Sequence, residues 1–134
     1  MCIDYRQLNL VTKKDHYPLP FIDQILEKLS GQEYFCFLDG YLKYNQVAIH
    51  LDDQEKTTFI SLCGTYAFKR MPFRLCNALA TFQRCMFAMF FDLVGKGLEI
   101  FMDDFSIYGS SFDMCLDIVT HVLQICVEKR LVLS

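Results

Sequence analysis

The chain has 134 residues, of which 53% are hydrophobic and 15% are aromatic, and its formal net charge is −3 at pH 7. This length suits one domain with a buried core, and the hydrophobic content excludes an intrinsically disordered chain. The slightly acidic balance excludes a protein that binds nucleic acid through its overall charge, so any such contact must be local.

The N-terminal third of the chain predicts a strand, a loop and an amphipathic helix. Residues 1–9 are typical of a strand that runs into a turn, and residues 13–20 are typical of a loop that its prolines hold extended. A helix is expected over residues 21–30, with Gly31 as a natural stop. Its apolar stripe consists of Ile22, Ile25, Leu26 and Leu29.

A second strand ends at an aspartate. Residues 34–38 are rich in aromatic side chains and predict a buried strand, which a turn over residues 40–46 follows. Alternation places Asp39 on the same face as Phe35 and Phe37. A carboxylate at the end of an apolar strand is costly to bury, so Asp39 is a candidate functional residue.

Short strands and a long helix are predicted in the middle of the chain. The strands are expected at 47–50, 57–62 and 66–69, and a loop follows over 71–76. A long helix begins near Asn77, a good N-cap residue, and ends at Gly95 and Gly97. Its apolar stripe consists of Phe82, Met86, Met89 and Leu93.

The last third predicts a hairpin and a final helix. Residues 98–108 predict two strands, with Asp103 and Asp104 in the turn between them. Residues 110–113 resemble a capping box for a helix that runs to about Arg130. The other expected features are its apolar face, made by Cys115, Val119, Val122 and Cys126, and an extended segment over 131–134. Because strands and helices do not alternate strictly, the expected fold class is α+β.

The seven cysteines predict neither a disulfide framework nor a zinc site. Their number is odd, no C-x-x-C pair occurs, and the three histidines lack the spacing of metal ligands. Because the cysteines lie in apolar stretches, we interpret them as reduced core residues of an intracellular protein. The sequence leaves open whether that protein lies in a cytoplasmic particle or in the nucleus. The most apolar stretch, residues 85–94, is too short to span a membrane and contains Asp92, so no membrane partner is expected.

Three aspartates form the candidate chemical site. An ordinary hairpin turn favours Asn-Gly or Asp-Gly, so turn chemistry alone does not explain Asp103 and Asp104. If the strand that ends at Asp39 lies beside this hairpin, three carboxylates converge with no basic partner nearby in the sequence. Oxygen ligands without His or Cys suit Mg²⁺ or Mn²⁺, and two such ions can clamp the oxygens of a phosphoryl transfer. The spacing equally favours aspartates that cap strands at a solvent edge.

Several motifs occur in order along the chain. They are CIDYRQLN at 2–9, YPLP at 17–20, Asp39 with Tyr44 five residues later, MPF at 71–73, NA at 77–78, TFQ at 81–83 and FMDD at 101–104. Together they resemble a reverse transcriptase palm, and they are most similar to the gypsy-type LTR retrotransposon family. The resemblance covers essentially the whole chain, so it is more specific than any one motif.

The resemblance implies a fold and an activity. The fold would be a polymerase right-hand palm, an antiparallel sheet with packed helices, plus partial fingers. Residues 1–134 would form a single partial reverse transcriptase domain that is truncated at both ends, with the thumb, connection and RNase H domains absent. The parent protein would be an RNA-directed DNA polymerase that acts on an RNA or DNA template-primer and deoxynucleoside triphosphates, together with the remaining polyprotein domains. The isolated fragment would be weak or inactive.

The resemblance also implies roles for individual residues. Asp39, Asp103 and Asp104 would be catalytic and would hold two Mg²⁺ or Mn²⁺ ions. Tyr44 would lie under the incoming sugar and exclude a 2′-hydroxyl, Gln83 would contact the nucleotide or template, and Arg6 would lie in the fingers near the template. Without the resemblance, the last three are equally a core aromatic, a polar helix residue and a surface charge.

The chain departs from the family pattern at three places. Arg74 stands where the family has glycine, Leu79 stands where proline is usual, and Leu42-Lys43 replaces a Ser-Gly pair before Tyr44. We expect Leu79 to be tolerated and the altered turn to disturb Tyr44. Arg74 would either impair the approach of nucleic acid, which we favour, or grip a phosphate. Two rival interpretations therefore stay open: a non-catalytic remnant of a decayed retroelement that acts at most as a binding or structural fragment, and an unrelated Mg²⁺ phosphohydrolase.

Overall fold

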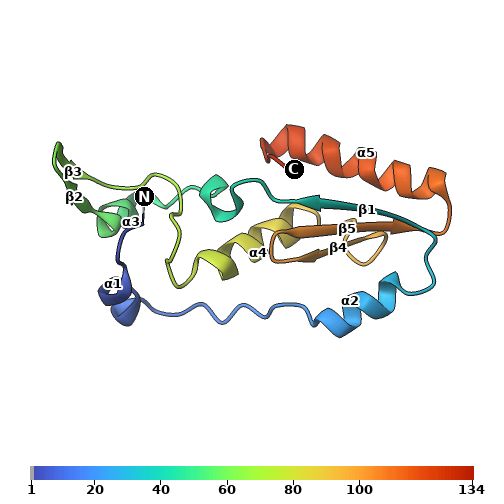
Figure 1. The fold of residues 1–134 in the computed structure, drawn as a ribbon, viewed down its shortest axis with the longest axis horizontal. Coiled ribbons are helices and arrows are strands. Elements are labelled where there is room, and N and C mark those ends of the chain that lie inside the picture. The colour runs from blue at the N-terminus through green and yellow to red at the C-terminus, as the bar shows by residue number, and fades with distance from the viewer. Residues whose placement is uncertain (1) are drawn as a thin grey trace.

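The structure is a computed structural model that describes residues 2–134. Figure 1 shows an elongated molecule with two unequal ends. A three-stranded sheet with long helices forms the larger end, and short helices with a small two-stranded sheet form the other. The predicted α+β class is confirmed.

The larger sheet consists of β1 (Tyr34–Asp39), β5 (Asp104–Gly109) and β4 (Leu98–Phe101), in that order and antiparallel throughout. The predicted hairpin is therefore confirmed, as β4 and β5. Strand β1 pairs with β5 along its whole length, from Tyr34 opposite Gly109 to Asp39 opposite Asp104. Because of this register, the end of β1 and the tip of the hairpin meet at the same edge of the sheet (Figure 1).

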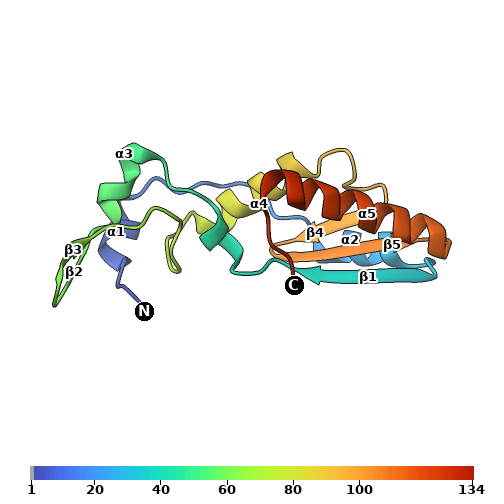
Figure 2. The same cartoon turned by 90° about the horizontal axis from the view of Figure 1, so that it is seen from above.

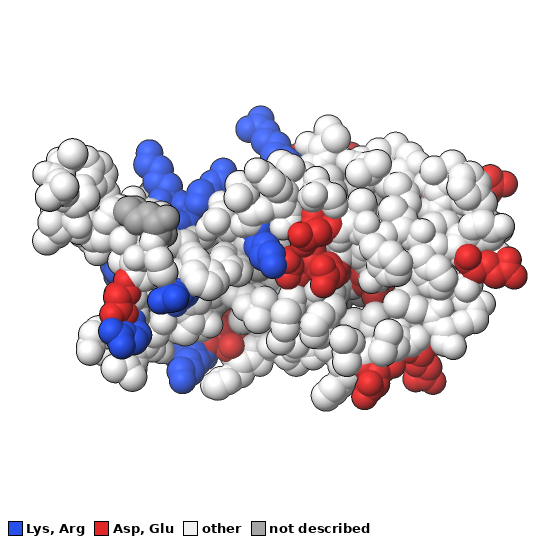
Figure 3. Space-filling view, in the orientation of Figure 1, with Lys and Arg blue, Asp and Glu red and all other residues white. Residues whose placement is uncertain are grey.

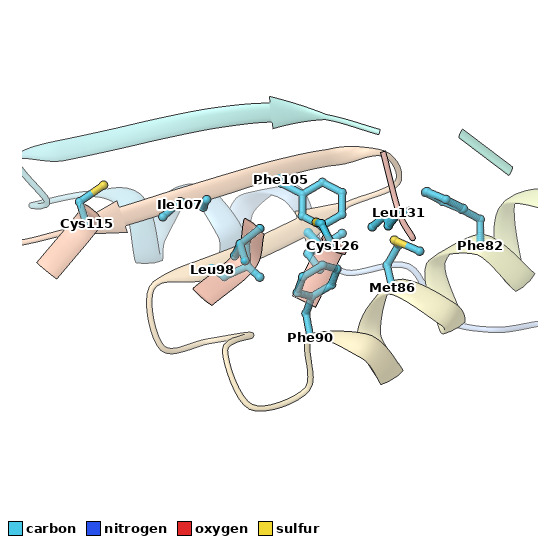
Figure 4. Packing of buried hydrophobic residues seen from close by; sticks show 11 residues of the cluster. Phe82, Met86, Phe90, Leu98, Phe105, Ile107, Cys115, Cys126 and Leu131 are labelled. Atoms are coloured by element: carbon cyan, nitrogen blue, oxygen red, sulfur yellow. The ribbon is translucent and has the colours of Figure 1, made fainter. Parts of the chain in front are cut away.

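Two helices cover one face of this sheet. They are α4 (Ala78–Met89) and α5 (Phe112–Lys129), and Figure 2 shows both on the same side of the strands. Phe105 and Ile107 of β5 point to that side and belong to one buried cluster with both helices. Figure 4 shows the cluster, whose other labelled members are Phe82, Met86, Phe90, Leu98, Cys115, Cys126 and Leu131. This core fixes the sheet that carries the three aspartates.

The predicted stripe of the long helix is partly wrong. The fully buried side chains of α4 include Phe82 and Met86, and the stripe continues to Phe90 just after the helix, whereas Met89 and Leu93 are only partly buried. Residues spaced by four lie on one helical face, and Phe90 follows Met86 at that spacing. The ring of Phe90 meets that of Phe105 edge-to-face, with ring centroids 5.3 Å apart.

The opposite face of β1 is open, so the prediction of a buried strand is wrong. Cys36 and Leu38 pack against the core, but Phe35 and Phe37 are exposed and stack on each other with ring centroids 6.1 Å apart. Both faces of the strand are apolar, and the sequence pattern alone could not show that helices cover only one of them.

The other end of the molecule is built from short elements. They are α1 (Arg6–Val11), α3 (Leu51–Gln54), the 3₁₀ helix η2 (Glu55–Thr57), β2 (Phe59–Ser61) and β3 (Gly64–Tyr66). The predicted strand over 1–9 is wrong for its described residues, and Met1 lies outside them. Arg, Gln and Leu favour a helix there, and the buried Tyr5 anchors it by donating from its hydroxyl to the Thr57 carbonyl at 3.0 Å.

Two further expectations concern the connecting segments. The predicted strand over 47–50 is wrong, because only Ala48 pairs there, in an isolated bridge to Arg70. The predicted helix over 21–30 is confirmed as α2 (Ile22–Leu29). Of its stripe only Ile25 is buried, and an ion pair from Lys28 to Glu99 at 2.9 Å links α2 to the sheet. Within residues 2–134, no helix combines the length and apolar character that a membrane crossing requires.

Candidate metal centre

Three carboxylates come together at the edge where β1 meets the hairpin. Asp39 is the last residue of β1, Asp104 is the first residue of β5, and the two are opposite each other in the register. Asp103 lies in the turn between β4 and β5. One oxygen from each of the three side chains lies within 4.8 Å of the other two. The predicted convergence of Asp39 with the hairpin is therefore confirmed.

The hairpin turn is one residue earlier than predicted. Phe101 pairs with Asp104, so Met102 and Asp103 are the two turn residues and Asp104 already belongs to β5. Met102 supplies the positive φ that a two-residue hairpin needs, at 57°. The turn thus places two successive carboxylates differently: Asp103 at the tip and Asp104 on the sheet.

Backbone hydrogen bonds fix the end of β1 to this turn and to the C-terminal segment. The Gly40 amide donates to the Asp103 carbonyl at 2.8 Å, and a Cβ on Gly40 would lie only 3.4 Å from that oxygen. On the other side, the amides of Asp39 and Ser134 donate to each other's carbonyls at 2.9 and 2.7 Å. The position of Asp39 therefore depends on two segments that are distant from it in the sequence, the hairpin turn and the C-terminal segment.

Negative charge is concentrated at this site, and one lysine partly balances it. The Lys43 ammonium lies 2.5 Å from Oδ2 of Asp103, and the Lys43 side chain is 50% exposed. The hydrogen bond with Asp103 raises the pKa of Asp39, and burial and the Asp103 charge raise it further. The hydrogen bond to Asp103 likewise raises the pKa of Lys43, so this lysine carries its full charge. Figure 3 shows acidic side chains gathered near the middle of this face, with basic side chains towards the end that carries α1.

Tyr44 lies beside the carboxylates. It belongs to the 3₁₀ helix η1 (Lys43–Gln46), and its ring stacks on Phe73 with centroids 6.4 Å apart and planes inclined by 21°. A pocket of about 280 Å³ opens between these elements; its lining includes Asp39, Lys43, Tyr44, Phe73 and Ser134. The structure thus brings Tyr44 to the same pocket as Asp39.

The altered turn before Tyr44 keeps a backbone that suits glycine. Leu42 and Lys43 have φ values of 56° and 47°, in the left-handed region. Arg74, which replaces another family glycine, has a φ of 77° and lies over the Phe73 ring at 5.5 Å from its centroid. Lys43 and Arg74, which stand where the resemblance leads us to expect glycine, thus both adopt a left-handed φ.

Gln83 and Arg6 are not brought to the carboxylates. Gln83 has no exposed surface; its Nε2 donates to the Ile100 carbonyl at 3.2 Å, and its Oε1 has no partner among the described residues. Because it lies on the buried side of α4, its side chain supports β4. Arg6 is exposed on α1, and its guanidinium pairs with Asp4 at 2.6 Å.

Sequence reasoning missed two contributors. It assigned no basic partner to the three aspartates, yet Lys43, four residues after Asp39, is that partner. The lysine could have been found, since a turn after Asp39 returns the chain towards the strand end. The contact of Ser134 with Asp39 has no signal in the sequence, because backbone hydrogen bonds do not depend on side-chain identity.

Comparison with known proteins places this geometry in a family. The family model described as reverse transcriptase (RNA-dependent DNA polymerase) matches residues 1–134. The chain belongs to the reverse transcriptase family. Over 109 residues it is 41% identical to the retrovirus-related Pol polyprotein from transposon 297 of Drosophila melanogaster. The aligned region covers 81% of this chain and 10% of that polyprotein. It is 39% identical over 108 residues to an RNA-directed DNA polymerase homolog of Oenothera berteroana. This aligned region covers 81% of this chain and 76% of the homolog.

The relation of this reverse transcriptase chain to gypsy-type LTR retrotransposons is confirmed. The Pol polyprotein from transposon gypsy of Drosophila melanogaster is 37% identical over 111 residues, 83% of this chain and 11% of the polyprotein. The fold matches a foamy viral protease-reverse transcriptase in complex with dsDNA with a TM-score of 0.88 and 22% identity, over 100% of this chain and 28% of that one. The chain thus spans about a tenth of the Pol polyproteins that it matches.

Proposed function

We propose that the chain provides the catalytic palm and part of the fingers of an RNA-directed DNA polymerase. The observation that carries the proposal is the convergence of Asp39, Asp103 and Asp104 at one edge of a shared sheet. In the proposed reaction, the 3′-oxygen of a primer attacks the α-phosphate of a deoxynucleoside triphosphate, and pyrophosphate leaves. The acceptor would be a primer paired with an RNA or DNA template.

The donor set fits divalent cations of the Mg²⁺ or Mn²⁺ type. All three side chains offer carboxylate oxygens, and no His or Cys joins the group formed by the described residues. The pKa of Asp39 is raised chiefly by its hydrogen bond with Asp103, then by burial and by the Asp103 charge, so a cation would favour the charged form of these carboxylates. When bound, two such cations would supply the positive charge that activates the attacking oxygen and neutralises the phosphates.

Other residues of the chain have proposed roles around this centre. The Tyr44 ring, held by its stacking on Phe73, would limit the space beside the sugar and so exclude a 2′-hydroxyl. Arg6 would contact the template from α1, at the end of the molecule where basic side chains gather (Figure 3). Gln83 would act on the template only indirectly, by holding the strand that leads to Asp103.

The proposed activity belongs to a longer protein. The chain spans 28% of a foamy viral protease-reverse transcriptase and about a tenth of the Pol polyproteins, so these residues would form one part of the polymerase. They would supply the residues that hold the metals, and other parts of the polymerase would supply much of the surface that grips primer and template. We expect weak or no polymerisation by the chain alone.

Metal binding by the chain itself is the direct test. Mn²⁺ titration by electron paramagnetic resonance should show binding that Asp103→Asn abolishes and that Asp117→Asn, a change on the outer face of α5, leaves intact. Mg²⁺ at about 100 times its dissociation constant should stabilise the fold by roughly 2.7 kcal/mol, measurable as a rise in melting temperature. Absence of both effects would favour the non-catalytic remnant.

Primer extension tests the reaction. A longer protein that joins this chain to fingers and thumb segments of a related polymerase should extend a primer on an RNA template, and Asp103→Asn should remove the activity. Full extension by the Asp103→Asn protein would refute the assignment. Hydrolysis of small phosphate esters without a template would favour the phosphohydrolase.

A further inference from the structure

Lys43 occupies the position of a cation at the proposed metal centre. Its ammonium contacts Oδ2 of Asp103 at 2.5 Å, and its pocket also contains Asp39. No other lysine or arginine in the part of the chain that the structure describes forms an ion pair with any of the three aspartates. The site therefore has its own positive charge before any metal binds.

The position of this lysine is fixed by the backbone. Lys43 follows Asp39 by four residues, and its amide donates to the Gly40 carbonyl at 3.1 Å, which closes the turn after β1. Leu42 and Lys43 both adopt left-handed φ values, a path more typical of glycine. The turn thus carries the base of the side chain back towards the end of the strand, within reach of Asp103.

We infer that Lys43 is an internal counter-cation that competes with divalent metal for Asp103 and so weakens metal binding by this chain. The inference rests on the proposed metal centre. A metal that uses Oδ2 of Asp103 must displace the ammonium from that oxygen, because two cations at this distance repel each other. The half-exposed side chain has solvent into which it can move, so displacement needs no change in the fold.

The magnitude follows from the exposure of the pair. An ion pair of this exposure changes an equilibrium constant by a factor of about two to five. Removal of the lysine charge should therefore raise the association constant of the metal by the same factor. The expected gain in Mn²⁺ affinity on Lys43→Met is therefore about two- to fivefold. Without metal, the same variant should melt at a lower temperature than the wild-type chain, because three carboxylates then lack their counter-charge.

Isothermal titration with MnCl₂ tests the inference on the full chain. Lys43→Met removes the charge and keeps most of the aliphatic stem, while Lys43→Arg keeps the charge. Because both side chains impose the same backbone strain as lysine, a difference in Mn²⁺ affinity between the two variants reports the charge alone. Lys96→Met, at an exposed lysine far along the chain, is the matched control. Tighter binding by Lys43→Met only, with unchanged circular dichroism, is the expected result. Equal or weaker binding by Lys43→Met would overturn the inference.

A second measurement separates this inference from the proposed function. Acetylation of Lys43, followed by mass spectrometry, should become faster when saturating Mg²⁺ is added, while acetylation of Lys96 should not change. If wild-type chain binds Mn²⁺ but Lys43 labelling and the affinity of Lys43→Met are unaltered, only the counter-cation role fails. If no variant binds Mn²⁺, the metal centre and the role of Lys43 fail together.

Discussion

Two adjacent phenylalanines give a sharp test of the core. Phe90 has no exposed surface and packs edge-to-face on Phe105, whereas the ring of Phe91 is 77% exposed. Burial of an aromatic side chain removes about 150 Å² from water, which at about 25 cal/mol per Å² corresponds to roughly 4 kcal/mol. Phe90→Ala should therefore lower the free energy of unfolding by about 3–5 kcal/mol. Phe91→Ala should change it by less than about 0.5 kcal/mol.

Urea denaturation followed by far-UV circular dichroism measures both variants against the wild-type chain. For a chain of this length, a loss of that size also lowers the melting temperature of Phe90→Ala by roughly 10–15 °C. If Phe90→Ala does not fold, the milder Phe90→Leu should still lose more stability than Phe91→Ala. Equal losses at the two positions would refute the packing of α4 against β5 described above.

Three further predictions concern the cap of α5, the ion pair under α2 and a buried thiol. Ser111 accepts a hydrogen bond from the first turn of α5, so Ser111→Ala should cost about 1 kcal/mol in urea denaturation, and Ser110→Ala less than half of that. Lys28→Met should lower the free energy of unfolding by about 3 kcal/mol, because it leaves the buried Glu99 carboxylate without its cation. Glu99→Gln should lower it by only about 1 kcal/mol, because the half-exposed Lys28 side chain can return to water. Equal losses for this second pair would contradict the burial of the carboxylate. Burial raises the pKa of Cys126 from 9.0 to about 11, so its contribution to stability is complete below pH 9 and is lost as pH rises towards 11. Urea midpoints measured across this range should fall less steeply in Cys126→Ala than in the wild-type chain.

Local patterns in the sequence were sufficient to identify several parts of the site. Alternation along residues 34–38 placed Asp39 on a defined face of a strand, and the apolar runs around Asp103 and Asp104 predicted the hairpin. The ordered motifs added what periodicity cannot supply, namely that these two distant segments belong together. The register of β1 on β5 then brings the carboxylates to the same edge.

The features that were missed depend on tertiary contacts. Exposure of Phe37 follows from which face of β1 the helices cover, and burial of Gln83 follows from the orientation of α4. Both residues have ordinary local patterns, so only packing distinguishes a buried position from an exposed one. The first helix was missed because Tyr5 is anchored by Thr57, a partner far along the chain. Such partners have no short-range signal.

The bonding of Asp39 to two distant segments, the hairpin and the C-terminal segment, has a consequence for biosynthesis. Strand β1 leaves the ribosome well before β5, and the Leu131–Ser134 segment that pairs beside Asp39 leaves after both. Pairings between segments so far apart form slowly, since loop closure precedes any gain from contact. In the nascent polypeptide the three carboxylates would therefore remain far apart. The proposed metal centre could not bind a divalent ion until β5 and the segment after α5 had been translated.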